Sequence, residues 1–235
     1  MNKIIYKLFF AVFLLLISCD DGDLHPEGTG EAEGLKATME VSFSGLKAWP
    51  SAYQMVLAAY GNDTENPLMS KQISVPKSEN DIVVLDLNGL PEEARTIGIS
   101  ILTKGRKLVY NYYTYDIGNA TEDVVLPISQ INVASFDRIQ HQVFDNYCAP
   151  CHDAGDKAAA GLSLTDGKSY MSLVKVKANL SATNKNRIEP GMPSQSFLVD
   201  ILTEDIVNYN HTDVLPQEEL VTLIKEWITQ GAKDN

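Results

Sequence analysis

The hydrophobic period of this chain changes at about residue 135, and that change limits the folds it can adopt. Between residues 36 and 127, apolar side chains recur at every second position, as in Met39, Val41 and Phe43. This is the period of a strand with one buried face. From Ser135 onward the period is close to that of a helix, 3.6 residues. The sequence therefore predicts a multidomain chain, with a domain of strands followed by a small domain of helices.

Residues 36–131 contain about seven strand-length apolar runs, separated by turn sequences such as Asn88-Gly89 and Lys104-Gly105. Short strands at this spacing predict an all-β antiparallel sandwich, immunoglobulin-like in outline. One strand is crowded with aromatic rings, and a further large ring precedes it: Tyr110, Tyr112, Tyr113 and Tyr115, with Trp49. We expect these rings to pack across strands. The alternative is an exposed row of rings that binds a glycan or a partner protein.

Residues 132–235 contain several predicted helices. Ser135 is expected to cap the first, which leads directly into Cys148. Two shorter helices are predicted over residues 170–180 and 196–202. Pro216 suits the first position of the last helix, and Gly231 can end it. The apolar faces expected to be buried are Phe136, Ile139, Val143 and Phe144 in the first helix, and Leu220, Leu223, Ile224, Trp227 and Ile228 in the last.

The first 18 residues resemble a bacterial lipoprotein signal peptide. Lys3 and Lys7 precede an apolar run of ten residues, 8–17, which is too short for a membrane span of about 20 residues. Small Ser18 stands before Cys19. We expect Cys19 to carry the lipid, and an ordinary secretory signal is the alternative. Residues 19–35 are acidic and rich in glycine, which predicts a flexible tether.

The signal peptide predicts where the chain works, and the charge balance predicts one class of partner that it does not bind. A lipid at Cys19 would anchor the protein in the cell envelope, at the periplasmic or surface side of the outer membrane and facing away from the cytoplasm. The chain has 19 Lys and Arg against 31 Asp and Glu, a net charge of −12. Because a phosphate backbone is bound by basic surfaces, we expect no nucleic-acid partner.

Two further cysteines stand in the sequence Cys148-Ala149-Pro150-Cys151-His152. A disulfide, a thioredoxin-like redox pair, a zinc site and covalent haem attachment are the four interpretations of such a pair. Zinc needs a second ligand pair at short spacing, and a thioredoxin site needs a βαβ pattern; the sequence has neither. A disulfide leaves His152 without a role. Haem c uses all three residues, since both sulfurs bond the vinyl groups and His152 becomes the proximal iron ligand.

Residues 132–233 resemble the monohaem cytochrome c domain of bacterial secreted and lipid-anchored proteins. The resemblance rests on the haem motif and on these shorter matches: Phe144 and residues 161–164, 187–196 and 227–232. It implies a small all-α cytochrome c domain over residues 132–235, with one haem c and single-electron exchange with a redox partner protein of the envelope. In such domains the first and last helices cross, which would place Phe144 near Trp227.

The distal iron ligand departs from this family. A Met-Pro pair before the last helix usually supplies it, but here the matching pair is Leu215-Pro216, and a leucine cannot bind iron. His211 and Met192 are the two candidate ligands, and iron without a second protein ligand is the third alternative. We expect Met171 to be a core residue and His141 a surface residue.

Three functions follow from these features. The favoured one is a membrane-anchored c-type cytochrome that transfers single electrons, more an electron carrier than a catalyst. With open iron, the protein would instead be a five-coordinate haem enzyme or gas sensor, peroxidase-like in chemistry. The third is a surface recognition lipoprotein whose β domain binds glycan or protein.

Overall fold

A computed structural model describes residues 34–79, 81–153 and 158–235 of the chain. The predicted signal peptide, Cys19 and all but the last two residues of the predicted tether lie outside these residues. Within the part of the chain that is described, no helix is long and apolar enough to cross a membrane.

The first of two sheets is built on β1 (Leu35–Ser44), the longest strand. It pairs antiparallel with β4 (Val83–Leu90), and parallel with two short strands, β7 (Val124–Val125) and β8 (Gln130–Asn132). Every second side chain of β1 is buried, as the sequence predicts: Ala37, Met39, Val41 and Phe43. The parallel pairs depart from the predicted antiparallel sandwich.

The second sheet has the strand order β3-β2-β5-β6 and is antiparallel throughout. Its strands are β3 (Met69–Gln72), β2 (Gln54–Tyr60), β5 (Thr96–Leu102) and β6 (Leu108–Asp116). The rings of Tyr110 and Tyr112 on β6 meet edge to face with centroids 4.9 Å apart, and the Tyr112 hydroxyl donates to the carbonyl oxygen of Val133 at 3.1 Å. Both rings pack against the core, but their contact with each other lies within one strand and not across strands as predicted.

The first predicted helix is not regular. It consists of one α-helical turn, α2 (Phe136–Ile139), followed by a π-helix, η3 (Gln140–Cys148). The Ser135 side chain caps it by accepting from the backbone N–H of Arg138 at 3.2 Å. The predicted apolar face is fully in place, with the following side chains buried: Phe136, Ile139, Val143 and Phe144.

The later helices are short. They are α3 (Ser169–Leu173), α4 (Phe197–Thr203) and α5 (Glu218–Thr229), with one-turn 3₁₀ helices at η2 (Leu46–Ala48), η4 (Ala159–Gly161) and η5 (Pro193–Gln195). The prediction of a helix to residue 180 is wrong beyond Leu173, because Val174 there bridges to Ile188 instead. Met171 is 78% exposed, so its prediction as a core residue is also wrong. His141 is exposed, as expected.

Helix α5 matches its prediction closely. Its apolar stripe is buried almost completely: Leu220, Leu223, Ile224, Trp227 and Ile228. Gly231 ends the helix in the left-handed region at φ 98°, where its N–H donates to the carbonyl oxygen of Ile228 at 2.9 Å. The Phe136 ring contacts that of Trp227, with centroids 5.1 Å apart, and lies 6.1 Å from that of Phe144, so all three rings belong to one core.

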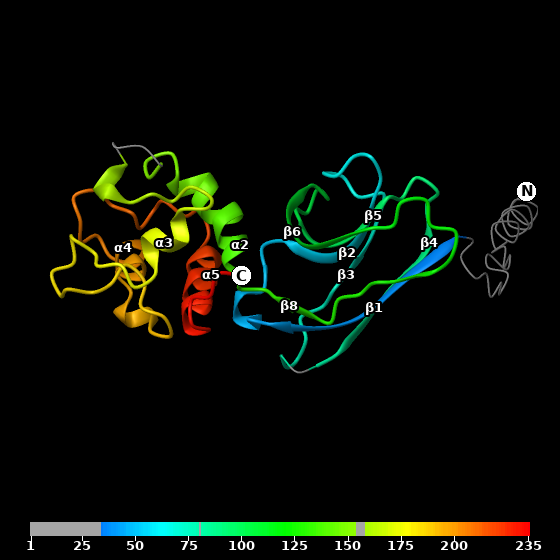
Figure 1. The fold of residues 1–235 in the computed structure, drawn as a ribbon, viewed down its shortest axis with the longest axis horizontal. Coiled ribbons are helices and arrows are strands. Elements are labelled where there is room, and N and C mark those ends of the chain that lie inside the picture. The colour runs from blue at the N-terminus through cyan, green and yellow to red at the C-terminus, as the bar shows by residue number, and fades with distance from the viewer. Residues whose placement is uncertain (1–33, 80, 154–157) are drawn as a thin grey trace, which may run out of the picture. The chain divides into compact units, whose positions relative to one another are not determined.

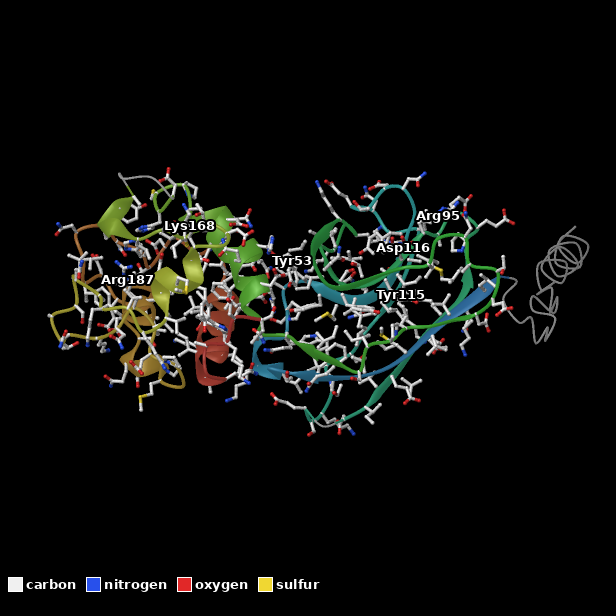
Figure 2. All side chains as sticks on the ribbon, viewed as in Figure 1. Tyr53, Arg95, Tyr115, Asp116, Lys168 and Arg187 are labelled. Carbon is white, nitrogen blue, oxygen red and sulfur yellow. The ribbon has the colours of Figure 1, made fainter. Side chains whose placement is uncertain are left out.

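The predicted separate all-α cytochrome c domain is wrong. Residues 34–235 form one compact unit of two sheets with a few short helices, and one large hydrophobic core runs through both, beside a small second cluster in the second sheet. Helices α2 and α5 are the ones nearest the sheets (Figure 1). On α5, Glu219 Oε2 accepts from the backbone N–H of Ala52 at 2.9 Å, and Tyr53, which lies where sheets and helices meet, accepts from Gln217 Nε2 at 3.3 Å (Figure 2).

The helical part forms no separate domain because its helices are short. Helices of four to twelve residues bury too little apolar surface to close a core of their own, so they complete it against the sheets. Arg138 belongs to this junction: it is fully buried, and its guanidinium donates to the carbonyl oxygens of Ala48 at 2.7 Å and Val133 at 3.1 Å.

Candidate functional site

The π-helix η3 leads the chain into a tight turn that carries the Cys-x-x-Cys-His sequence. The carbonyl oxygen of Cys148 accepts from the backbone N–H groups of Cys151, at 3.2 Å, and His152, at 3.0 Å. Both cysteines are free thiols, and burial raises the pKa of the Cys148 thiol to about 12. π-helical segments are rare and are found frequently at functional sites. The turn gathers the two thiols and the imidazole that the sequence predicts as haem-binding residues.

All three of these side chains line one cavity of about 440 Å³, within the size range of cofactor sites. Its walls come from the Cys-x-x-Cys-His turn, η4, the segment around α3, helix α4 and the loop that precedes α5. The lining is mostly apolar, with these aliphatic members: Leu162, Leu164, Leu173, Leu180, Leu198, Ile201, Leu202, Val207 and Val214.

His152 is held in one orientation. Its Nδ1 lies 2.9 Å from the carbonyl oxygen of Ala159, and because a carbonyl only accepts, Nδ1 must carry the proton. In the neutral form of this ring, Nε2 carries the lone pair. Burial lowers the pKa of His152, and the neighbouring His211 adds to that shift. The neutral imidazole with a hydrogen-bonded Nδ1 is the usual form of a histidine that ligates a metal.

His211, one of the two predicted candidates for the distal ligand, lines the same cavity as His152. Its ring centroid is 6.4 Å from that of His152, with 27° between the two planes, and the ring of Tyr209 meets it edge-on at 5.0 Å. The Nδ1 atom of His211 is buried and has no hydrogen-bond partner among the described residues. The structure thus brings together two imidazoles separated by 59 positions in sequence.

The alternative distal candidate lies elsewhere. The side chain of Met192 is 55% exposed, and it is not among the described residues that line the cavity. Leu215 is not among the described lining residues either, although its neighbour Val214 is.

Arg187 is a site residue that the sequence did not single out. It is the one charged side chain in the described lining of the cavity, in the helical region of the fold (Figure 2). Its guanidinium donates to the carbonyl oxygens of Ser172 at 2.8 Å and Ala160 at 3.4 Å. Burial lowers the pKa of Arg187, but an arginine stays charged at neutral pH. Arg187 begins one of the stretches that carry the resemblance, residues 187–196, but the sequence gave it no role.

The donor set limits the chemistry of the cavity. Among the described residues, no group of three or more His, Cys, Asp or Glu side chains is arranged to hold a metal ion by itself. Two thiols, two imidazoles and one arginine instead surround an apolar space.

In comparisons with known proteins, no family model, no curated protein and no solved structure matched this chain.

Proposed function

We propose that this protein binds one haem c through Cys148 and Cys151, with His152 as the proximal iron ligand, and transfers single electrons in the cell envelope. One observation carries the proposal: both thiols and a neutral imidazole line the same apolar cavity. Covalent haem attachment requires these three groups within one turn of chain.

The other residues of the cavity fit the same group. The aliphatic walls suit the apolar face of a porphyrin, which would otherwise expose its area to water. Arg187 offers a fixed positive charge, which suits the carboxylates of the haem propionates. A zinc or disulfide interpretation of the cysteines explains neither the apolar space nor the arginine.

Each residue has a distinct task under this proposal. The haem supplies an iron that changes charge by one electron, and the chain controls its surroundings. Cys148 and Cys151 fix the ring to the turn, while the carbonyl oxygen of Ala159 holds His152 in its ligating tautomer. The aliphatic walls exclude water from one side of the site. An apolar site suits electron transfer because little solvent has to rearrange when the charge changes.

The proposed location follows from the N-terminal residues. A lipid at Cys19 would hold the protein at a membrane of the envelope, near a redox partner protein. The net charge of −12 favours a partner with a basic surface, and salt screens that attraction.

The experiment is haem retention under denaturing conditions. The full chain is produced together with a haem c maturation system and is then extracted with acid–acetone. We expect wild-type protein and the control Pro150→Ala, altered at an exposed position of the same turn, to keep their haem. The double variant Cys148→Ala with Cys151→Ala should lose it. Free extraction of the wild-type haem, or failure of the holoprotein to take up one electron reversibly in a potentiometric titration, would overturn the proposal.

A further inference from the structure

We infer that His211 is the second axial ligand of the haem iron, which makes the site a six-coordinate bis-histidine centre closed to external ligands. The inference rests on the proposed function, because it requires haem at Cys148 and Cys151. It goes further by fixing what reaches the iron: electrons, but neither peroxide nor gaseous ligands.

The separation of the two rings carries the argument. A metal–imidazole bond is about 2.0 Å long and a ring nitrogen lies about 1.2 Å from the ring centre, so two imidazoles on opposite sides of one metal ion have ring centres about 6.4 Å apart. The ring centres of His152 and His211 are 6.4 Å apart. The planes of the two rings are inclined to each other by 27°.

A second observation concerns the state of the His211 ring. Its Nδ1 is buried and makes no hydrogen bond within the described residues, in a cavity whose walls are mostly apolar. A buried polar atom without a partner is unfavourable, and native proteins rarely keep one unless an ion, a water molecule or a ligand completes the site. By contrast, His152 satisfies its Nδ1 on the carbonyl oxygen of Ala159.

The loop that carries His211 is formed to face the cavity. Five of its residues line the cavity: Val207, Asn208, Tyr209, His211 and Val214. The Asn210 side chain accepts from the backbone N–H of Thr212 at 2.9 Å, and the Tyr209 ring packs edge-on against the imidazole. The described lining contains no methionine and no third histidine, so His211 is the one imidazole in it besides His152.

Bis-histidine ligation has a measurable consequence. The thioether of a methionine favours ferrous iron, so replacing it by an imidazole lowers the reduction potential. Leu215 at the position where the resembling domains carry methionine is consistent with this change of ligand.

The test uses the purified holoprotein. We expect ferric wild type to be low-spin by electron paramagnetic resonance, and its ferrous form not to bind carbon monoxide on mixing at neutral pH. His211→Ala should become high-spin and bind carbon monoxide, and added imidazole should restore the low-spin spectrum. The control Met192→Ala, at an exposed position outside the described lining, should match wild type.

Two results would overturn the inference: a high-spin wild type, or a low-spin spectrum that is unchanged in His211→Ala. Should that variant fail to fold, near-infrared magnetic circular dichroism of the wild type distinguishes two imidazoles from an imidazole–thioether pair without any substitution. Haem retention is measured on every sample. Loss of haem from denatured wild type contradicts the proposed function, whereas retained haem with an unchanged His211→Ala spectrum contradicts only the role of His211.

Discussion

Trp227 tests most directly whether the sheets and the helices share one core. It is 1% exposed on α5, its ring lies 5.1 Å from that of Phe136, and its Nε1 donates to the carbonyl oxygen of Lys233 at 2.7 Å. We consider Trp227→Phe, which keeps an aromatic ring against Phe136 but removes the N–H and part of the buried surface.

The expected loss of stability can be worked out from these contacts. Phenylalanine lacks about three of the indole ring atoms, and each buried carbon contributes about 0.8 kcal/mol, so the packing loss is about 2 kcal/mol. The lost hydrogen bond adds about 1 kcal/mol. The free energy of unfolding should fall by about 3 kcal/mol, which lowers the Tm of a domain of this size by roughly 6–12 °C.

The assay follows unfolding with two probes. The chain has two tryptophans, so in Trp227→Phe the fluorescence comes from Trp49, whose ring packs against Phe43 of β1 at 5.4 Å. Far-ultraviolet circular dichroism reports the whole fold. A single core requires both probes to shift together, with Met171→Ala as an exposed control that changes stability by less than about 0.5 kcal/mol. A Trp49 transition that stays at its wild-type temperature while the dichroism shifts would refute the shared core.

Three further predictions concern the junction, the cavity and the anchor. Gly45 has φ 73°, and a Cβ there would lie 3.0 Å from Ala134. Gly167 has a similar φ of 72° but open space around it, so Gly45→Ala should lower the Tm more than the control Gly167→Ala. Equal losses of Tm in the two variants would contradict this prediction. Arg187→Leu should lower the haem reduction potential by on the order of tens of millivolts in spectroelectrochemistry, because a positive charge near the iron favours the reduced form; an unchanged potential would place Arg187 away from the haem. Cys19→Ala should move the protein from the membrane fraction to the soluble fraction, and unchanged membrane association would exclude lipidation at that residue.

The sequence by itself determined the features that depend on near neighbours in the chain. Alternation along β1 predicts its buried face, because successive side chains of a strand point to opposite sides. The stripe on α5 and its end at Gly231 follow from helical spacing and from glycine's freedom at positive φ. The turn that gathers Cys148, Cys151 and His152 is equally local, so these candidate haem-binding residues could be identified from spacing alone.

Only the tertiary structure decided how these elements combine. The parallel pairing of β1 with β7 and β8 joins residues more than 80 positions apart, as in Ala37 with Val124, and no local pattern specifies it. The shared core arises because helices this short bury enough apolar surface only by packing on the sheets. For the same reason the sequence left His211 and Met192 as alternatives and did not assign Arg187 to the site: His211 and Arg187 reach the cavity from separate segments, and folding of the whole unit brings them to it.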